Sequence, residues 1–192
     1  CEQYPQKIGL PFSINSRVDT LNRETIGKLK QAGCIRISMG IETGDTVVRN
    51  TVCKRNQSDE QIIEAFTLVR ESGIKTLSYN MVGIPFETRE SISKTIELNR
   101  KCRPDFIAVS IFNAYKGTEI YDLCRENGWL KDENGKAYFQ TSNINHPDFS
   151  LAELKRIRDS FGYHVYKSYN YKRAFIEVFD KKMLRSRLYQ QC

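Results

Sequence analysis

Apolar residues recur along the first two-thirds of the chain in two alternating periods. Short apolar or alternating runs, typical of strands, are each followed by a segment with apolar residues every third or fourth position, as in an amphipathic helix. This alternation predicts four consecutive βα units, in which parallel strands are joined by right-handed crossovers. The expected strands are residues 8–18, 34–41, 75–82 and 106–112.

Signals at the helix ends support this division. Ser58-Asp59-Glu60-Gln61 and Ser150-Leu151-Ala152-Glu153 are capping boxes, which begin helices by satisfying two free backbone amides. Single residues that can cap a helix precede the remaining helical patterns. These residues are Asn22, Thr88 and Thr118.

The predicted units divide the chain into three parts. Residues 1–130 hold four βα units, which are too few to close a barrel of eight. The fold class is therefore α/β, either as a small open sheet or as part of a larger barrel, with an unpaired edge at strand 8–18. Residues 131–149 are polar and predict a loop or small hairpin, and residues 150–192 predict helices rich in basic and aromatic side chains.

Composition and charge narrow the class of protein. The 192 residues suffice for one well-buried domain, and no apolar run is long enough to span a bilayer. The net charge is +7, and its excess lies largely in the basic and aromatic C-terminal segment. Such a segment could contact RNA or a membrane surface, but a helix with a solvated basic face is the simpler interpretation.

The cysteines and histidines do not form a recognisable metal or redox motif. None of the six cysteines has CxxC or zinc-knuckle spacing, and Cys34 and Cys124 lie in apolar surroundings where they would pack as small hydrophobic residues. We therefore expect no metal ligand in this chain and a reducing, cytoplasmic location. His146 and His164 also lack ligand spacing.

Polar side chains gather where the predicted strands end. Together they would suit a zwitterionic ligand with a sugar, because its carboxylate favours Arg or Lys and its ammonium and hydroxyl groups favour Glu or Asn. The alternative is that these groups only cap helices and loops, and we expect Asp45 and Glu87 to lie in solvated loops. The strand-end residues are Asn15, Arg17, Glu42, Thr43, Tyr79, Asn80, Asn113 and Tyr115.

Five segments, taken in order, resemble the radical S-adenosylmethionine (SAM) superfamily. The resemblance extends over residues 8–130 and is nearest to the branch with cobalamin-dependent members and oxygen-independent coproporphyrinogen oxidases. It implies an open barrel of six βα units, of which this chain would hold units three to six. The segments are Arg17-Val18-Asp19-Thr20-Leu21, Ala32-Gly33-Cys34, Ser38-Met39-Gly40-Ile41-Glu42-Thr43-Gly44, Asn80-Met81-Val82-Gly83-Ile84-Pro85-Phe86-Glu87-Thr88 and Gly117-Thr118-Glu119-Ile120-Tyr121.

The resemblance also implies cofactors and a reaction. Family members hold a 4Fe–4S cluster on a CxxxCxxC loop, and an electron donor such as flavodoxin or ferredoxin reduces it. Cleavage of SAM then yields a 5′-deoxyadenosyl radical that removes a substrate hydrogen. Because CxxxCxxC is absent here, we expect a fragment that begins after the cluster loop and is inactive alone. Cobalamin is a further candidate cofactor.

Cofactor-binding roles at the first two strands follow from the same resemblance. Asn15 lies where relatives place a polar or acidic residue, and Glu42 lies where a Glu or Gln meets the ribose or amino acid part of SAM. Lys54 lies where relatives place a basic residue for the SAM carboxylate. Arg55 is an adjacent candidate, and Arg17 is a further cation at the rim.

The last two strands supply the remaining candidates. Tyr79 or Asn80 is expected near the ribose, and the backbone at Asn113 and Ala114 is expected near adenine. Tyr115 is a candidate substrate contact at the barrel mouth. Two other readings stay open, namely a non-catalytic α/β module whose tail contacts RNA or membrane, and a fragment of a barrel hydrolase or aldolase.

Overall fold

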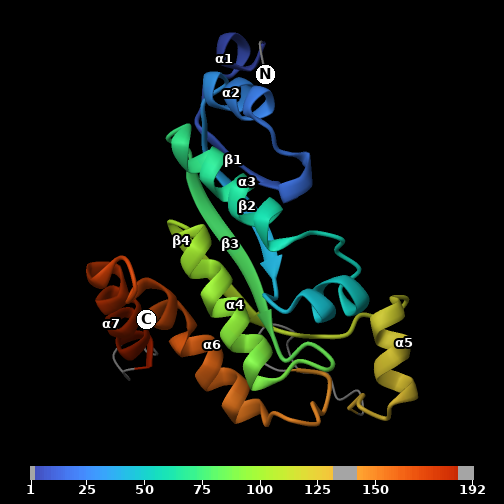
Figure 1. The fold of residues 1–192 in the computed structure, drawn as a ribbon. Coiled ribbons are helices and arrows are strands. Elements are labelled where there is room, and N and C mark those ends of the chain that lie inside the picture. Colours follow the sequence, from blue (N-terminus) through green and yellow to red (C-terminus); the bar gives the residue numbers. More distant parts are fainter. Residues whose placement is uncertain (1–2, 132–141, 186–192) are drawn as a thin grey trace.

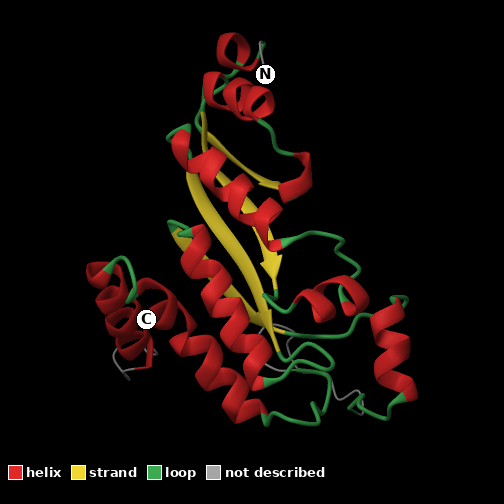
Figure 2. Cartoon of the chain, in the orientation of Figure 1, coloured by secondary structure: helices red, strands yellow, loops and turns green. Residues whose placement is uncertain are grey.

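Four parallel strands form the sheet at the centre of the molecule. The computed structural model describes residues 3–131 and 142–185, and its strands lie in the order β1-β2-β3-β4 (Figures 1 and 2). The predicted parallel α/β sheet is therefore confirmed. The strands are β1 (Phe12–Ser16), β2 (Cys34–Glu42), β3 (Lys75–Val82) and β4 (Phe106–Ile111).

Helices cover one face of this sheet, as Figure 1 shows. The covering helices are α2 (Arg23–Gln31), α3 (Asp59–Glu71), α4 (Arg89–Cys102) and α6 (Leu151–Tyr166). On the opposite face side chains are more open, and Tyr79 of β3 is 39% exposed. This half-exposed surface corresponds to the interior of an open barrel. The remaining elements are α1 (Tyr4–Lys7), η1 (Val18–Thr20), η2 (Val48–Val52), α5 (Glu119–Glu126) and α7 (Tyr171–Arg185).

The main core lies between the sheet and the helix layer. Alternate residues of β2, namely Ile37, Met39 and Ile41, are fully buried and belong to one cluster with Ile62 and Phe66 of α3. The period of two in the strand places these three side chains on the same face. Burial of each large apolar side chain contributes roughly 1.5–3 kcal/mol, so this face fixes the register of the sheet.

The predicted helix starts are formed by the expected residues. The side chain of Asn22 accepts a 2.9 Å hydrogen bond from the amide of Thr25, and Thr118 caps α5 in the same way. The capping boxes at Ser58 and Ser150 are both complete. Thr88 caps α4 and forms a reciprocal capping box with Ser91.

The first strand is shorter than predicted. Residues 4–7 form a helical turn, Gly9 takes a left-handed backbone with φ of +66°, and pairing begins only at Phe12. After Ser16 the chain turns into η1, which ends the strand. Within the described residues β1 pairs on one side only, as expected of an edge strand.

The C-terminal segment continues the same helix layer. Helix α6 packs against β4 and α4, and α7 packs against α6. Of the loop or small hairpin predicted at 131–149, residues 132–141 lie outside the described residues, and one isolated antiparallel bridge joins Leu130 to Ile144. No helix of the described residues is both long and apolar enough to span a membrane.

Candidate functional site

An ion pair stands at the carboxyl end of β2. A guanidinium nitrogen of Arg55 lies 2.8 Å from Oε1 of Glu42, whose side chain is only 12% exposed. Glu42 takes a left-handed backbone with φ of +63°, and the β2–β3 register shifts between Gly40 and Glu42. A Cβ at Gly40 would overlap the Glu42 carboxylate, so Gly40 leaves the space that the pair occupies. Burial raises the pKa of Glu42, and the charge of Arg55 opposes this rise.

The two basic candidates for the SAM carboxylate, Lys54 and Arg55, have different ion-pair partners in the structure. Lys54 takes a left-handed backbone with φ of +53°, and its ammonium group lies 3.3 Å from Glu119 of α5. Both partners of that pair are well exposed. Arg55, one residue later, contacts Glu42. The residue at the β2 rim is therefore Arg55.

Two polar side chains extend this rim across the neighbouring strands. The hydroxyl group of Tyr79 donates to Oδ1 of Asn15 at 3.4 Å, which links β3 to β1 over the open face. Tyr79 pairs in register with Gly40, the glycine beneath the Glu42–Arg55 pair. We call Asn15, Glu42, Arg55 and Tyr79 the rim site.

Two other predicted residues lie away from the rim site. Asn80 is buried on the helix-covered face, where its Oδ1 accepts a 2.7 Å hydrogen bond from Asn99 and its amide donates to Ser78. Arg17 forms a two-point ion pair with Asp19, at 2.9 and 2.7 Å. Asn80 pairs in register with Glu42, but its side chain points to the helix-covered face, so the structure brings neither the Asn80 side chain nor Arg17 to the Glu42 carboxylate.

The end of β4 is joined to a later segment. The side-chain amide of Asn143 accepts from the backbone N–H of Ala114 at 2.8 Å and donates to its carbonyl at 2.6 Å. The backbone N–H of Asn143 donates to Oδ1 of Asn113. Tyr115, which follows Ala114 in the sequence, is 56% exposed. Asn113 and Ala114 thus lie beyond β4, with their polar groups engaged by Asn143.

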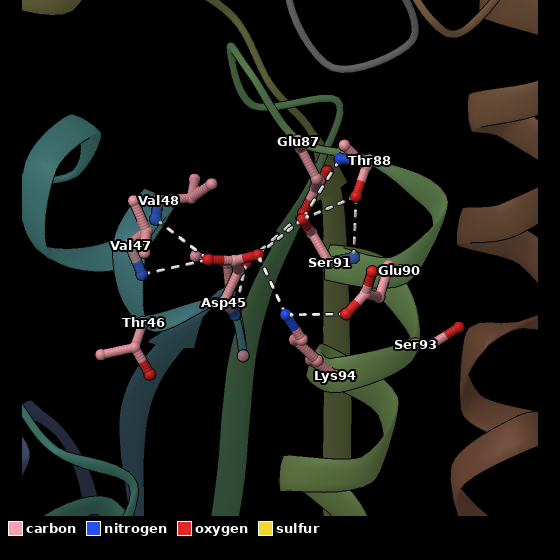
Figure 3. A network of polar contacts seen from close by, with 12 residues as sticks. Asp45, Thr46, Val47, Val48, Glu87, Thr88, Glu90, Ser91, Ser93 and Lys94 are labelled. Atoms are coloured by element: carbon pink, nitrogen blue, oxygen red, sulfur yellow. Dashed lines mark hydrogen bonds and ion pairs between the residues drawn. The ribbon is translucent and has the colours of Figure 1, made fainter.

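A buried polar network behind the rim corrects one expectation. Asp45 and Glu87 do not lie in solvated loops, because the side chain of Asp45 is 16% exposed and Glu87 is fully buried. Asp45 accepts from Ser91 at 2.8 Å and from the backbone amides of Val47 and Val48 (Figure 3). Burial alone would raise the pKa of Asp45, but these bonds, together with the charge of Lys94, outweigh it and lower the pKa. The position of Glu87 immediately before a helix cap is the sequence signal that could have indicated this network.

The cysteines of the described residues do not fit an iron–sulfur cluster. Cys34, Cys102 and Cys124 are buried, and no group of three candidate ligands occurs in the described part of the chain. Burial raises the pKa of Cys53 and of Cys124 to about 11 each, and that of Cys102 to about 12, whereas cluster ligands are thiolates. These side chains serve as apolar packing.

The parallel sheet is covered by helices on one face and carries polar side chains at the carboxyl ends of its strands. This arrangement is typical of an open α/β-barrel enzyme. The sequence model of the radical SAM superfamily matches residues 2–98, and the chain belongs to this family. The resemblance inferred from the motifs is thereby confirmed.

Curated relatives include enzymes of several kinds. The chain is 27% identical over 131 residues to an uncharacterized methyltransferase of Pyrococcus horikoshii, covering 68% of this chain and 28% of that protein. It is 32% identical over 107 residues to oxygen-independent coproporphyrinogen III oxidase of Helicobacter pylori, covering 55% and 23%. The chain thus spans only about a quarter of the length of these relatives.

Solved structures share the fold. Coproporphyrinogen III oxidase from Escherichia coli superimposes with a TM-score of 0.52 and 21% identity, over 82% of this chain and 30% of that one. The radical SAM methyltransferase TsrM from Kitasatospora setae, solved with cobalamin and a 4Fe–4S cluster, gives 0.56 and 18%, over 62% and 22%. Both are barrels of the radical SAM type, so the likeness supports the open-barrel fold.

Proposed function

We propose that this chain is the C-terminal part of a radical SAM enzyme barrel and that its rim site binds SAM. The observation that carries the proposal is the partly buried Glu42–Arg55 pair at the carboxyl end of β2, beside Tyr79 and Asn15. Ligands of parallel α/β sheets bind at this end of the strands. The family supplies SAM as the ligand class.

The donor set of the rim site fits SAM group by group. A guanidinium carries five N–H donors, so Arg55 can bind the SAM carboxylate while it keeps its bond to Glu42. The second carboxylate oxygen of Glu42 can accept from the SAM ammonium or from a ribose hydroxyl. Tyr79 and Asn15 offer a hydroxyl and an amide for the ribose. Lys54, Arg17 and the Asn113–Ala114 backbone remain secondary candidates, whereas the side chain of Asn80 is buried on the opposite face of the sheet.

The cluster requires ligands that the cysteines of the described residues do not supply. We infer that a CxxxCxxC loop upstream of Cys1 holds it, because the cysteines of the described residues do not fit. When bound, the cluster and SAM together supply a 5′-deoxyadenosyl radical after one-electron reduction by a donor of the flavodoxin or ferredoxin type. Cobalamin stays a prediction supported by the fold shared with TsrM. The residues of this chain would bind and orient SAM at the strand ends.

The candidate substrate contact of this chain is Tyr115. It follows directly on Ala114, beyond the end of β4, and is 56% exposed. The names of the relatives include a methyltransferase, an oxidase and a cyclase, which shows that related barrels serve several reactions. We propose Tyr115 as a substrate contact without assigning the substrate.

The proposal is tested on the full-length natural protein after anaerobic cluster reconstitution. Dithionite should release 5′-deoxyadenosine from SAM, as measured by chromatography. Glu42→Ala should reduce this release while the iron content stays unchanged, because Glu42 touches the ligand and not the iron. A reading frame without CxxxCxxC upstream, or equal activity in the variant, would contradict the assignment.

An exposed aromatic face on α7 supports the alternative function. Tyr171, Phe175 and Phe179 are 72%, 70% and 57% exposed in a segment rich in Lys and Arg. Such a helix could contact RNA or an anionic membrane surface. Binding to an RNA oligonucleotide or to anionic vesicles should then fall steeply with salt, and the Phe175→Ser variant should lose it. Absence of binding in low salt would remove this alternative.

A further inference from the structure

Arg49 lies in the middle of the loop that carries the Glu42–Arg55 pair. The loop extends from Thr43, directly after Glu42, to Gln57, two residues after Arg55, and η2 lies within it. Arg49 belongs to η2, and its charged side chain is fully buried. Burial of a cation is costly unless hydrogen bonds replace its water. The partners of this guanidinium therefore show what it holds in place.

The guanidinium of Arg49 joins the two ends of this loop. Its Nη1 donates a 3.1 Å hydrogen bond to the carbonyl of Thr43, and its Nε donates a 3.1 Å bond to the carbonyl of Gln57. Its Nη2 donates to Asp59 at 2.6 Å and to the hydroxyl oxygen of Thr46 at 3.3 Å. Asp59 is the first residue of α3, so the same side chain also ties the loop to the helix layer.

The backbone of Arg49 holds Arg55 directly. Its carbonyl accepts a 3.0 Å hydrogen bond from the amide of Arg55, and its own amide donates to the carbonyl of Asp45 at 2.8 Å. Asp45 in turn accepts from Ser91 in the first turn of α4 (Figure 3). Two points next to the Arg55 side chain are thus fixed by Arg49, namely the amide of Arg55 and the carbonyl of Gln57.

A guanidinium suits this task better than an ammonium group. The three nitrogens of Arg49 donate to acceptors in different parts of the chain, and the planar fork keeps these donors at fixed angles. A lysine has a single nitrogen, so pairing with Asp59 leaves the carbonyls of Thr43 and Gln57 without their donors. Arg49→Lys would therefore keep the charge and release both ends of the loop.

We propose that Arg49 is a positioning residue for the rim site. Its guanidinium fixes the loop before SAM arrives, and thereby holds Glu42 and Arg55 in the arrangement in which both bind the ligand. This inference rests on the proposed function, since it concerns how the same site is held. A loop without this anchor reaches the binding arrangement in only a fraction of the molecules, and the apparent affinity falls by that fraction.

The test measures affinity for S-adenosylhomocysteine by titration calorimetry, in the full-length protein after anaerobic cluster reconstitution. Arg49→Lys should raise the dissociation constant by about tenfold or more, because fewer molecules hold the loop in place. Arg100→Lys is the matched control. Arg100 lies in the last turn of α4, where it donates to the carbonyl of His164 at 3.2 and 2.9 Å and so joins α4 to α6. Its replacement should change the dissociation constant by less than about twofold.

A double-mutant cycle distinguishes positioning from a general loss of stability. Arg55→Ala removes the cation that Arg49 holds in place. Adding Arg49→Lys to Arg55→Ala should then weaken binding by less than about threefold, whereas two independent losses would multiply. Multiplied losses, or equal losses in Arg49→Lys and Arg100→Lys, would show that Arg49 only stabilises the fold.

Distinct outcomes separate the two proposals. A wild type that does not bind S-adenosylhomocysteine overturns the proposed function. A wild type that binds, with an Arg49→Lys variant of equal affinity, overturns the positioning role alone. Should Arg49→Lys fail to fold, hydrogen exchange of the ligand-free wild type decides. The amides of Arg55 and Gln57 should then exchange at least about a hundredfold more slowly than in an unstructured peptide, and exchange at the unstructured rate would overturn the inference.

Discussion

Gly44 should be the least replaceable glycine of the rim. It lies in the loop after Glu42, against the backbone of α4. A Cβ added there would overlap the carbonyl group of Lys94 and would lie 2.5 Å from the backbone nitrogen of Thr95, where real Cβ atoms essentially never come within 3.0 Å. The obstacle is helix backbone, which cannot rotate aside as a side chain can. Gly44→Ala must therefore move the loop or the helix.

The size of the effect follows from two contributions. Overpacking in a close-packed region costs about 1–3 kcal/mol. Moving the loop away from α4 also breaks the buried 2.8 Å hydrogen bond from the Gly44 amide to Thr95, which costs about 1 kcal/mol. Gly44→Ala should thus lower the free energy of unfolding by about 2–4 kcal/mol.

Gly27 provides the matched control. It lies inside α2, and a Cβ there would meet nothing within 4 Å. Alanine in a helix interior is more stable than glycine by about 0.5–1 kcal/mol, so Gly27→Ala should raise the free energy of unfolding. Urea denaturation followed by circular dichroism measures both variants. A Gly44→Ala protein as stable as the wild type would show that the close approach of loop and helix is not what the structure describes.

Three further predictions concern the rim and its surroundings. Arg55→Ala should weaken S-adenosylhomocysteine binding at least tenfold and Lys54→Ala less than twofold, as measured by calorimetry, because only Arg55 contacts Glu42. Replacing Cys53 or Cys124 by Ser should leave the iron content of the reconstituted protein unchanged, and loss of iron would contradict their packing role. Because burial raises the pKa of Glu87 to about 7, the native state holds this proton more tightly than the unfolded chain does. Its stabilising effect is complete below about pH 4.5 and is lost as the pH rises through 7, so urea denaturation should show the wild type losing about 3 kcal/mol relative to Glu87→Gln between pH 4 and 8.

Local signals were enough to predict most elements of the fold. The strand at Lys75–Val82 has the predicted bounds, and the capping boxes at Ser58 and Ser150 begin helices where expected. A capping box depends on residues three apart, and a strand pattern repeats every second residue, so the sequence displays both directly. The strand predicted at 8–18 was too long, since its alternating pattern could not show the helical turn before it or η1 after it.

The two faces of β3 show why the sequence pattern could not predict which strand-end side chains are buried and which face the open side. Hydrophobic side chains usually face the covered side of a sheet, yet here Thr76, Ser78 and Asn80 face the helices and Tyr79 faces the open side. Asn99 of α4 completes a buried polar network with Ser78 and Asn80, which satisfies their hydrogen bonds. A polar residue in this strand can therefore be buried. Distinguishing Tyr79 from Asn80 required the position of Asn99, which is remote in sequence.

Glu42 and Glu87 show why residue type alone does not assign a role to a carboxyl group. Glu42 and Glu87 both lie in loops or turns after a strand, and burial raises the pKa of each. Arg55 stands against Glu42 and favours its ionised form, whereas Glu87 has no cation beside it among the described ion pairs, and its hydrogen bonds from the Gly83 and Ile84 amides and from Thr43 offset burial only in part. Environments that divide two carboxyl groups in this way assign them different tasks. Glu42, paired with Arg55, suits the cationic part of a ligand, and the fully buried Glu87 suits the support of the loop. That division depends on which groups the fold places beside each carboxyl group, and neither glutamate reveals it within its own stretch of sequence.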